Sequence, residues 1–390
     1  MIHKLAIANY RSIRDLVLSL NQLNVVTGAN GSGKSNLYRA LRLVAETAYG
    51  SAAAVIAREG GLNSILWAGP EQFSRDVKSG KHPVEGTIRS DEISLRLGFV
   101  SDELSYAVDF GISTLQPGTS MFFRDPEIKR EVLWRGRDLW HSSRAVMDRK
   151  RPVVRVRNDE GKMELALKSL SLNQSVLSSL IDPHNHPEIF CLREEVHSWR
   201  FYDQFRTDKD SPLRQPHVGS FASVLSQDGS NIPSAWQTIC EIGDADRLQE
   251  HLEDAFPGST VIVEDSEGLF ALRMHQHGLL RALGQSELSD GTLRYLFWLV
   301  ALHSPRPPTM MVLNEPETSV HVDLLPALGR LIAASSESMQ IWVITHSDEL
   351  VDSLEEAKEC KRIRLEKELG ETLIEGEGPF DRVAWRWPAR

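Results

Sequence analysis

Short apolar runs alternate with amphipathic segments at both ends of the chain. Residues 2–8 and 23–27 have the length and apolar character of strands. A helical pattern follows residue 35, with four apolar residues on or near one face: Leu37, Leu41, Leu43 and Val44. From residue 288 onward the pattern predicts a helix over 290–303, a strand over 309–313, a helix over 323–334 and a strand over 341–345. Strands and helices in this order predict an α/β fold.

The middle of the chain has the two-residue alternation of antiparallel strands. Apolar side chains occupy alternate positions at Ile93, Leu95 and Leu97, and then at Leu104, Tyr106, Val108 and Phe110. Another hairpin is predicted around residues 159–161, so that 85–165 forms an antiparallel β region. Helical patterns cover 168–200 and 235–255, a polar loop covers 202–234, and a strand pair is predicted over 260–264 and 269–274. We therefore expect three regions: 1–165, a helical and loop insertion over 166–245, and 246–390.

Composition places the chain among ordinary globular proteins. Of its 390 residues, 41% are hydrophobic and 25% are charged. No run approaches the roughly eighteen apolar residues of a membrane span, and the N-terminus lacks the apolar core and cleavage site of a signal peptide. The three cysteines lie far apart and form no CxxC pair, which argues against a zinc site or a disulfide framework. We expect a cytoplasmic protein without a membrane segment.

One segment departs from the acidic balance of the chain. The net charge is −10, which argues against a surface coated with cations for non-specific nucleic-acid binding. Residues 124–157 nevertheless contain eleven Lys and Arg against five Asp and Glu. If these cations share one face, the segment predicts a DNA-binding surface; if they scatter or pair with acids, it does not.

A glycine-rich phosphate loop follows the predicted strand at 23–27. The sequence from Gly28 to Ser35 reads GxxxxGKS, and it stands between a strand and a helix, as such a loop requires. Its glycines let backbone N–H groups wrap phosphate, Lys34 adds a positive charge at the β/γ oxygens, and Ser35 offers a hydroxyl to Mg²⁺. We therefore predict these nucleotide-binding residues: Gly28, Asn30, Gly31, Ser32, Gly33, Lys34, Ser35 and Asn36.

The apolar strand at 309–313 ends in Asn314 and Glu315. Ligands of open α/β sheets bind at the carboxyl ends of the strands. Glu315 is placed to act as the general base on the water that attacks the γ-phosphate. This strand end resembles that of P-loop ATPases, which usually carry Asp before that Glu, where it holds Mg²⁺ through a water shell. Asn314 keeps an acceptor oxygen for the metal but lacks the charge, so reduced Mg²⁺ affinity or turnover is expected.

Two further short motifs complete a recognisable order. Ser289 and Gly291 open the helix at 290–303, where a Ser/Gly helix N-terminus is either an ordinary cap or an anion site. His346 follows the strand at 341–345, a position that resembles that of the histidine that senses γ-phosphate in ABC ATPases. Phosphate loop, Ser/Gly helix start, Glu-ended strand and strand–His follow one another in the order typical of ABC ATPases.

These residues resemble the RecF/SMC-like ABC ATPases, especially bacterial predicted ATPases of the RecF/OLD-like group. The opening Ala8-Asn9-Tyr10-Arg11-Ser12-Ile13 is similar to the start of that superfamily, and residues 314–321, NEPETSVH, are similar to its extended strand motif and D-loop. Residues 199–202 (WRFY) and 205–208 (FRTD) also resemble that group. The resemblance implies an ABC-type core with a mixed sheet, an antiparallel β subdomain and a helical insertion lobe.

The resemblance also implies cofactors, partners and a function. ATP and Mg²⁺ are the expected cofactors, and a homodimer with composite ATP sites is the expected assembly, in which Ser289 and Gly291 contact the partner's ATP. The first alternative for the function is an ATPase whose dimer grips DNA in repair, recombination or chromosome maintenance. The second is a regulatory switch that recruits an effector protein, for example in defence, without touching DNA.

Several features limit these alternatives. More than 250 residues separate the phosphate loop from Ser289, whereas a transporter ATPase subunit is shorter and has no such insert. No heptad run predicts the coiled coil of an SMC protein, and the 44 residues after His346 are too few for the nuclease domain of OLD-type proteins. Some assignments stay open: Gln72 or Gln116 as the Q-loop residue, and Tyr10 or Arg11 as a nucleotide contact.

Overall fold

The computed structural model describes residues 1–70, 77, 81–82, 94–113, 120–203, 205–378 and 380–390. The chain divides into two compact units, and each is assembled from segments far apart in sequence. Unit 1 comprises residues 1–21, 28–199 and 363–390, and unit 2 comprises residues 22–27 and 200–362. The three-region division expected from the sequence, at residues 165 and 245, stays a prediction.

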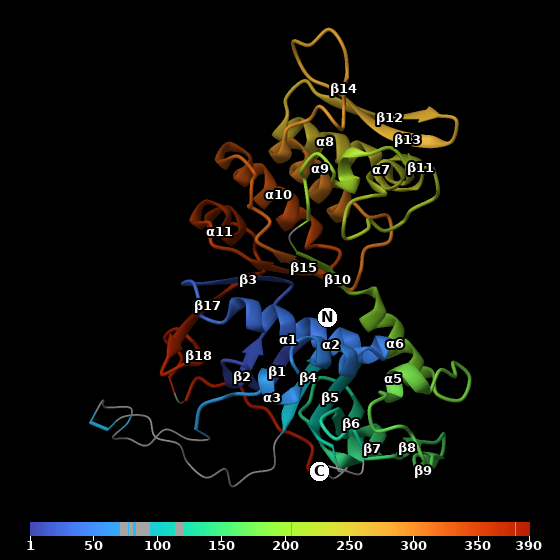
Figure 1. Cartoon of the computed structure of the whole chain (residues 1–390), viewed down its shortest axis with the longest axis vertical. Coiled ribbons are helices and arrows are strands. Elements are labelled where there is room, and N and C mark those ends of the chain that lie inside the picture. The colour runs from blue at the N-terminus through green and yellow to red at the C-terminus, as the bar shows by residue number, and fades with distance from the viewer. Residues whose placement is uncertain (71–76, 78–80, 83–93, 114–119, 204, 379) are drawn as a thin grey trace. The chain divides into compact units, whose positions relative to one another are not determined.

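Unit 1 contains an eight-stranded antiparallel sheet in the order β2-β1-β4-β5-β6-β7-β8-β9 (Figure 1). Its strands are β1 (Ile2–Tyr10), β2 (Ile13–Ser19), β4 (Leu95–Ser101), β5 (Leu104–Ile112), β6 (Pro126–Arg135), β7 (Ala145–Lys150), β8 (Val153–Arg157) and β9 (Met163–Leu167). Cross-strand pairs such as Leu97 with Val108 place the alternating apolar residues on a shared face. The expected antiparallel region is therefore confirmed over the described part of 85–165.

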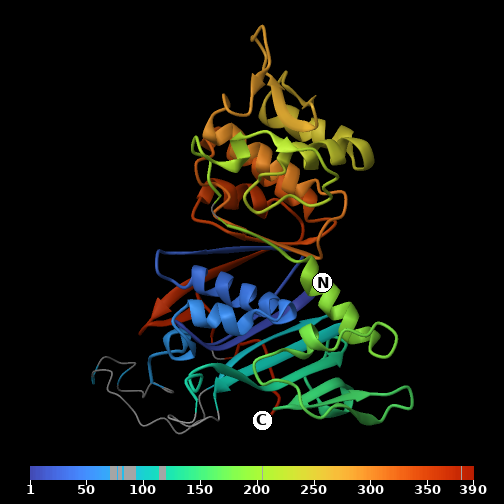
Figure 2. The same cartoon turned by 45° about the vertical axis from the view of Figure 1, so that its right-hand side comes forward.

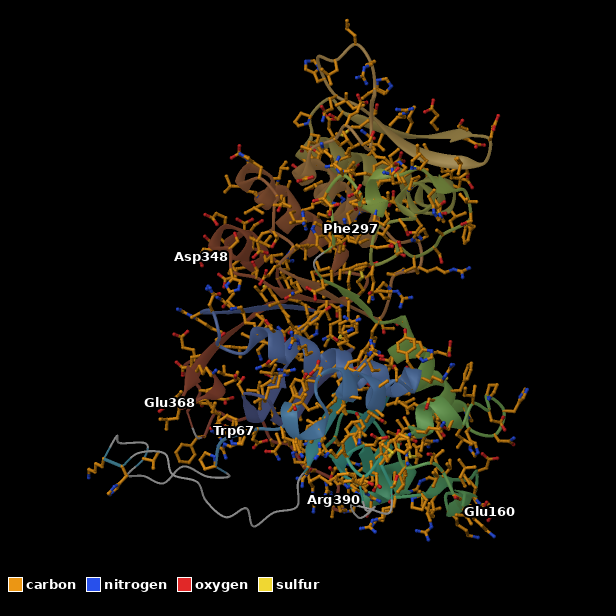
Figure 3. All side chains as sticks on the ribbon, in the orientation of Figure 1. Trp67, Glu160, Phe297, Asp348, Glu368 and Arg390 are labelled. Carbon is orange, nitrogen blue, oxygen red and sulfur yellow. The ribbon has the colours of Figure 1, made fainter. Side chains whose placement is uncertain are left out.

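Helices α1 (Lys34–Tyr49) and α2 (Ala52–Arg58) lie along one face of this sheet (Figure 2). The other face is covered by Trp385 and Trp387 of the chain's last segment, which pack on a cluster containing Val100, Ala107, Val132 and Trp134. Arg390, labelled in Figure 3, donates two hydrogen bonds to the buried carboxylate of Asp109 on β5, at 2.7 and 2.8 Å. The remaining helices of unit 1 are α3 (Leu62–Ile65), α5 (Val176–Ser179) and α6 (Pro187–Ser198).

Unit 2 is built on parallel strands in the order β10-β15-β16-β3. These strands are β10 (Arg200–Tyr202), β15 (Met310–Asn314), β16 (Gln340–Ile344) and β3 (Leu23–Gly28), whose last residue belongs to unit 1. Residues 341–344 are completely buried, as expected for a parallel strand covered on both faces. The apolar runs at 23–27, 309–313 and 341–345 are thus confirmed as strands to within a residue.

Helices surround the apolar centre of unit 2, where Phe297 of α9, labelled in Figure 3, is fully buried. These helices are α7 (Ile232–Ile242), α8 (Ala245–Ala255), α9 (Asp290–Leu302), α10 (Leu325–Ser335) and α11 (Asp348–Glu355). A smaller sheet contains β11 (His217–Val218), β12 (Thr260–Ser266), β13 (Leu269–His275) and β14 (Leu283–Gly284). Two strands that the sequence pattern did not indicate, β17 (Cys360–Glu368) and β18 (Glu371–Ile374), form an antiparallel hairpin. None of the helices among the described residues is long and apolar enough to cross a membrane.

Candidate nucleotide-binding site

The glycine-rich loop has a backbone that only glycine can adopt at two positions. Gly28 and Gly33 have φ values of 146° and 113°, in the region that L side chains rarely occupy. A Cβ atom at Gly28 would lie 2.3 Å from the carbonyl oxygen of Leu365, and one at Gly33 would lie 2.1 Å from Oγ1 of Thr372. A Cβ at Gly31 would meet no atom of the described residues within 4 Å, so the loop is open at this residue.

The Lys34 side chain forms hydrogen bonds with the backbone of the loop. This side chain is buried, and its ammonium donates hydrogen bonds to the carbonyl oxygens of Gly28 at 2.6 Å and Ala29 at 3.1 Å. Ser35, in the first turn of α1, is exposed. The N-terminus of this 16-residue helix adds amide groups and the positive end of the helix dipole to the same loop. The arrangement therefore fits an anionic ligand.

A cavity of about 460 Å³ lies beside the loop, within unit 1. Its walls come from the loop and from the β17–β18 hairpin: Ala29, Asn30, Gly31, Ser32, Arg364, Leu365, Glu366, Lys367 and Glu375. The volume is in the range of small-molecule and cofactor sites. The loop and the cavity together fit a nucleotide, and the individual nucleotide-binding residues stay predictions.

A chain of three hydrogen bonds supports the loop from behind. The amide nitrogen of Asn36 donates to Ser12 Oγ at 2.7 Å, and Ser12 Oγ lies 2.7 Å from Thr372 Oγ1. Thr372 Oγ1 donates to the carbonyl oxygen of Ser32 at 2.9 Å, so the Ser12 hydroxyl donates to Thr372. Ser12 belongs to the NYRS stretch at the start of the chain and Thr372 to β18. Both residues position the loop, and the sequence alone did not single out Thr372.

Thr372→Val is expected to weaken this support. Valine has a similar shape but no hydroxyl, so the buried carbonyl of Ser32 loses its partner. Such a loss costs about 1–3 kcal/mol, and we expect that decrease in the free energy of unfolding together with weaker ATP binding. Urea denaturation and binding of a fluorescent ATP analogue measure the two effects. Thr260→Val, at an exposed strand position, is the control; equal stability and ATP affinity in Thr372→Val and the control would contradict a positioning role.

The parallel strands of unit 2 end at one edge of their sheet, and polar residues follow each of them. Asp203 follows β10, Glu315 follows β15, and Thr345 and His346 follow β16. Strand β3 continues directly into the glycine-rich loop at Gly28. This is the edge at which open α/β sheets bind their ligands.

Glu315 and His346 face each other at this edge. Glu315 Oε1 lies 3.5 Å from His346 Nε2, and both side chains are partly exposed. The backbone of Glu315 has a positive φ of 51°, a strained conformation for a residue with a side chain, and its N–H donates to the carbonyl oxygen of Ile344 at 2.7 Å. Strained residues of this kind concentrate at functional sites. The two residues singled out in the sequence are thus brought together.

Glu317 fixes the turn that carries His346. Its Oε1 accepts hydrogen bonds from Thr345 Oγ1 at 2.7 Å and from the His346 N–H at 2.8 Å. Sequence reasoning assigned no role to Glu317, although the repeated acid in the Glu-Pro-Glu stretch was the available signal. Its carboxylate positions His346 relative to Glu315.

Asp203 lies beside Asn314. The Asn314 side-chain amide donates a hydrogen bond of 2.8 Å to Asp203 Oδ1. The two residues are neighbours because β10 pairs in parallel with β15, with Tyr202 opposite Leu313. Sequence reasoning did not single out Asp203, because the three-residue strand β10 is too short to give a recognisable pattern.

The start of α9 combines a cap with a close backbone contact. Ser289 is the N-cap: its exposed hydroxyl accepts from the Thr292 N–H at 3.1 Å. A Cβ atom at Gly291 would lie 3.0 Å from the carbonyl oxygen of Ser319, so glycine also allows the 315–320 turn to approach the helix. Gly291 therefore has a packing role within the chain in addition to the predicted contact with ATP.

One arginine holds the segment that leads into α9. Arg214 donates to the carbonyl oxygens of Gln285, Ser286 and Leu288 at 3.4, 3.2 and 2.8 Å, and to the Asp290 carboxylate at 2.6 Å. Arg214 comes from the segment 202–234 that the sequence indicated only as a loop. This guanidinium fixes the position of the Ser289 cap, and only the structure shows it.

The basic segment 124–157 does not form one unpaired cationic face. Six of its eleven Lys and Arg pair with carboxylates: Lys129–Glu127, Arg130–Asp148, Arg135–Glu188, Arg137–Asp102, Arg144–Asp138 and Arg149–Glu131. Three of these cations are buried, at positions 129, 130 and 149. Arg157 donates to backbone carbonyl groups. The exposed cations outside these pairs are Arg124, Lys150, Arg151 and Arg155.

Tyr10 and Arg11 contact a carboxylate on α2's C-terminal side. The Tyr10 hydroxyl and the Arg11 guanidinium donate to Glu59 Oε2 at 3.1 and 2.8 Å. Burial, together with the charge of Glu59, raises the pKa of Tyr10 to about 12. Their proposed contact with nucleotide stays untested. The Q-loop candidates Gln72 and Gln116 lie outside the described residues.

Comparison of the chain with known proteins agrees with this fold. A family profile described as "AAA domain, putative AbiEii toxin, Type IV TA system" matches residues 23–352. The structure and this match define a P-loop ATPase domain of the ABC/SMC-like class. The chain belongs to that family of AAA domains. No curated protein matches its sequence.

Several solved structures are similar to the chain at low sequence identity. An Smc head bound to the C-winged helix domain of ScpA is 13% identical, with a TM-score of 0.55 over 96% of this chain and 97% of that chain. The SMC head domain from Thermotoga maritima is 14% identical, with a TM-score of 0.45 over 96% and 97%. An Smc head domain with an extended coiled coil, bound to the C-terminal domain of ScpA derived from Pyrococcus furiosus, is 13% identical, with a TM-score of 0.48 over 96% and 95%. The first of these likenesses shows that the fold is that of an SMC head, as the sequence predicted.

Proposed function

We propose that the protein binds ATP with Mg²⁺, hydrolyses ATP, and uses the bound nucleotide to switch its association with a second copy of itself and with a partner protein. The observation that carries the proposal is the Glu315–His346 pair, 3.5 Å apart, at the carboxyl edge of a parallel sheet. Strand β3 of the same sheet continues directly into the GxxxxGKS loop. The proposed base thus follows the parallel strand β15, and the phosphate loop follows the parallel strand β3.

Each residue has a defined task in this proposal. The loop amides and the Lys34 ammonium would bind the β- and γ-phosphates, and the Ser35 hydroxyl would be a ligand of Mg²⁺. Bound Mg²⁺ neutralises the charge that develops on the phosphate oxygens. Glu315 accepts a proton from the attacking water, and such a base contributes about 10²–10⁴-fold to a rate. His346, held by Glu317, lies beside that base and senses the γ-phosphate.

A homodimer is the assembly proposed from the ABC resemblance. In that arrangement the Ser/Gly helix start of one protomer completes the ATP site of its partner, so that two equivalent sites form across an isologous interface. The exposed Ser289 hydroxyl and the N-terminal amides of α9 support this role. Because ATP is then part of the interface, dimer formation is linked to ATP concentration by mass action.

Ser289→Arg is expected to separate ATP binding from dimer formation. Arginine places a bulky cation where the proposed contact fits a hydroxyl, so ATP should still bind the protomer while closure and hydrolysis are blocked. Sedimentation of Glu315→Gln protein with and without ATP, repeated after adding Ser289→Arg, measures the effect. Ser286→Arg, at an exposed position shortly before α9, is the matched control. A monomer under saturating ATP, or normal dimer formation by Ser289→Arg, would leave residues 289–292 as a helix cap only.

The charges of unit 1 favour a switch over a DNA clamp. Six of the eleven cations in 124–157 have carboxylate partners, and three are buried, so they offer little charge to a phosphate backbone. The family description, which mentions a putative toxin of a type IV toxin–antitoxin system, fits a role in defence. We therefore propose the effector-recruiting switch as the function, and DNA binding through the exposed cations Lys150, Arg151 and Arg155 as the second candidate.

The ATPase rate with and without DNA separates the two candidates. The switch predicts the same rate and the same sedimentation in the presence of duplex or single-stranded DNA at physiological salt. A rate that rises with DNA, and that loses this response when Lys150, Arg151 and Arg155 are changed to Ala, would instead support the DNA-directed ATPase. A RecF-like role in repair would follow only from that second outcome.

A further inference from the structure

The strand that carries the catalytic glutamate lacks the negative charge expected at its metal position. Asn314 occupies that position and presents a neutral amide. Mg²⁺ is a hard cation that favours oxygen ligands and is bound through one or two carboxylates plus the phosphates of the nucleotide. A neutral amide alone is therefore a weak partner for the metal at the edge where Glu315 stands.

The structure places a carboxylate directly beside that amide. Asp203 Oδ1 accepts a hydrogen bond of 2.8 Å from the Asn314 side-chain nitrogen. Because the nitrogen of the amide is directed at Asp203, the carbonyl oxygen of Asn314 is directed away from it. The pair thus has a neutral oxygen from one strand and a charged carboxylate from the next.

The surrounding structure holds Asp203 in place. Phe201 and Tyr202, the residues before it, are buried, and the Tyr202 hydroxyl donates to the carbonyl oxygen of Leu225 at 2.9 Å. The parallel pairing of Tyr202 with Leu313 sets Asp203 level with Asn314 at the carboxyl end of the sheet. Asp203 itself is exposed, so its carboxylate is accessible to a ligand at this edge.

We propose that Asp203 supplies the negative charge of the Mg²⁺ site and that Asn314 supplies its neutral oxygen. The acid of the metal site then follows β10, the strand next to β15, and the hydrogen bond between the two side chains orients both. This inference rests on the proposed ATP-binding function. It also predicts that Asn314→Asp alone does not improve metal binding, because a second carboxylate beside the first introduces like-charge repulsion.

An exchange of the two side chains tests the proposal. The affinity for a fluorescent, non-hydrolysable ATP analogue is measured in excess EDTA and as a function of added Mg²⁺, for the wild type, Asp203→Asn, Asn314→Asp and the double variant Asp203→Asn/Asn314→Asp. Asp210→Asn removes an exposed acid from the same segment and is the control. Binding is measured without turnover, so the result is independent of the hydrolysis rate.

Loss and recovery of the Mg²⁺ dependence are the expected results. Removing an oriented acid near a metal typically lowers metal affinity about 10- to 100-fold, so Asp203→Asn should need that much more Mg²⁺ for half-maximal binding. Its affinity in EDTA should equal that of the wild type. The double variant keeps one Asp and one Asn in contact with their positions exchanged, and it should recover most of the lost Mg²⁺ response. Asn314→Asp alone should not lower the Mg²⁺ requirement.

Three results have different meanings. A Mg²⁺ response of Asp203→Asn equal to that of Asp210→Asn overturns the role of Asp203. Failure of the folded double variant to recover shows that Asp203 only supports the fold of this edge. Absence of analogue binding by the wild type, with or without Mg²⁺, instead contradicts the ATP-binding function itself. If Asp203→Asn does not fold, the double variant decides by its own Mg²⁺ titration.

Discussion

A Glu315→Gln variant is expected to bind ATP but to hydrolyse it about 10²- to 10⁴-fold more slowly than the wild-type protein. Glutamine keeps the size of the side chain and a polar contact with His346, 3.5 Å away in the structure, but it cannot accept the proton of the attacking water. Single-turnover phosphate release measures the loss. Sedimentation should show that the ATP-bound dimer accumulates, because the step that ends it is blocked.

A matched variant separates the base from other acids of the same region. Glu337→Gln changes an exposed glutamate after α10 and should hydrolyse ATP at the wild-type rate. Glu317→Gln keeps an oxygen that can still accept from Thr345 and His346, so a much smaller loss is expected there than at Glu315. Wild-type turnover by Glu315→Gln, or an equal loss in Glu317→Gln, would assign the base to another residue.

Lys34→Ala is expected to abolish ATP binding, and with it hydrolysis and nucleotide-dependent dimer formation. The buried Lys34 ammonium lies within the loop and donates to two backbone carbonyl oxygens of the loop, at 2.6 and 3.1 Å. Alanine removes this cation, so the phosphates of ATP lose their charged partner. Equilibrium binding of a fluorescent ATP analogue measures the loss. The fold should survive, since the two hydrogen bonds removed involve a charged group and are worth about 1.5–3 kcal/mol each, less than the total stability of a typical domain.

The control for Lys34 is another lysine of unit 1. Lys168→Ala removes an exposed ammonium and should leave ATP affinity unchanged. Circular dichroism and urea denaturation of both variants establish that any difference in binding comes from the loop. Wild-type ATP affinity in a folded Lys34→Ala protein would be incompatible with a phosphate-binding role for residues 28–35.

Local sequence determined the elements and the motifs that stand at their ends. A buried strand, a glycine-rich turn and a helix can each be recognised within about fifteen neighbouring residues, because apolar periodicity and glycine conformations are local properties. The strands β3, β15 and β16, the helix α9 and most of the antiparallel sheet were predictable for that reason, and so were Lys34, Ser289, Glu315 and His346 as candidates. The order of these motifs, with the resemblance to RecF/SMC-like ABC ATPases, predicted an ABC-type core, and the likeness to an SMC head agrees with it.

The tertiary structure alone decided which distant residues support those motifs. Thr372 reaches the carbonyl of Ser32 across 340 residues of sequence, and Asp203 reaches Asn314 across 111. The carboxylate partners of the basic segment 124–157 were also unpredictable from local sequence, because strand pairing and packing bring its cations to these carboxylates. Hydrogen bonds and ion pairs depend on distances that are set by strand register and packing. Neither the register nor the packing has a local sequence signature when a strand is as short as β10. The candidate residues of the site were therefore readable from the sequence, whereas the residues that orient them, and Asp203 as the proposed charge of the metal site, emerged only from the folded chain.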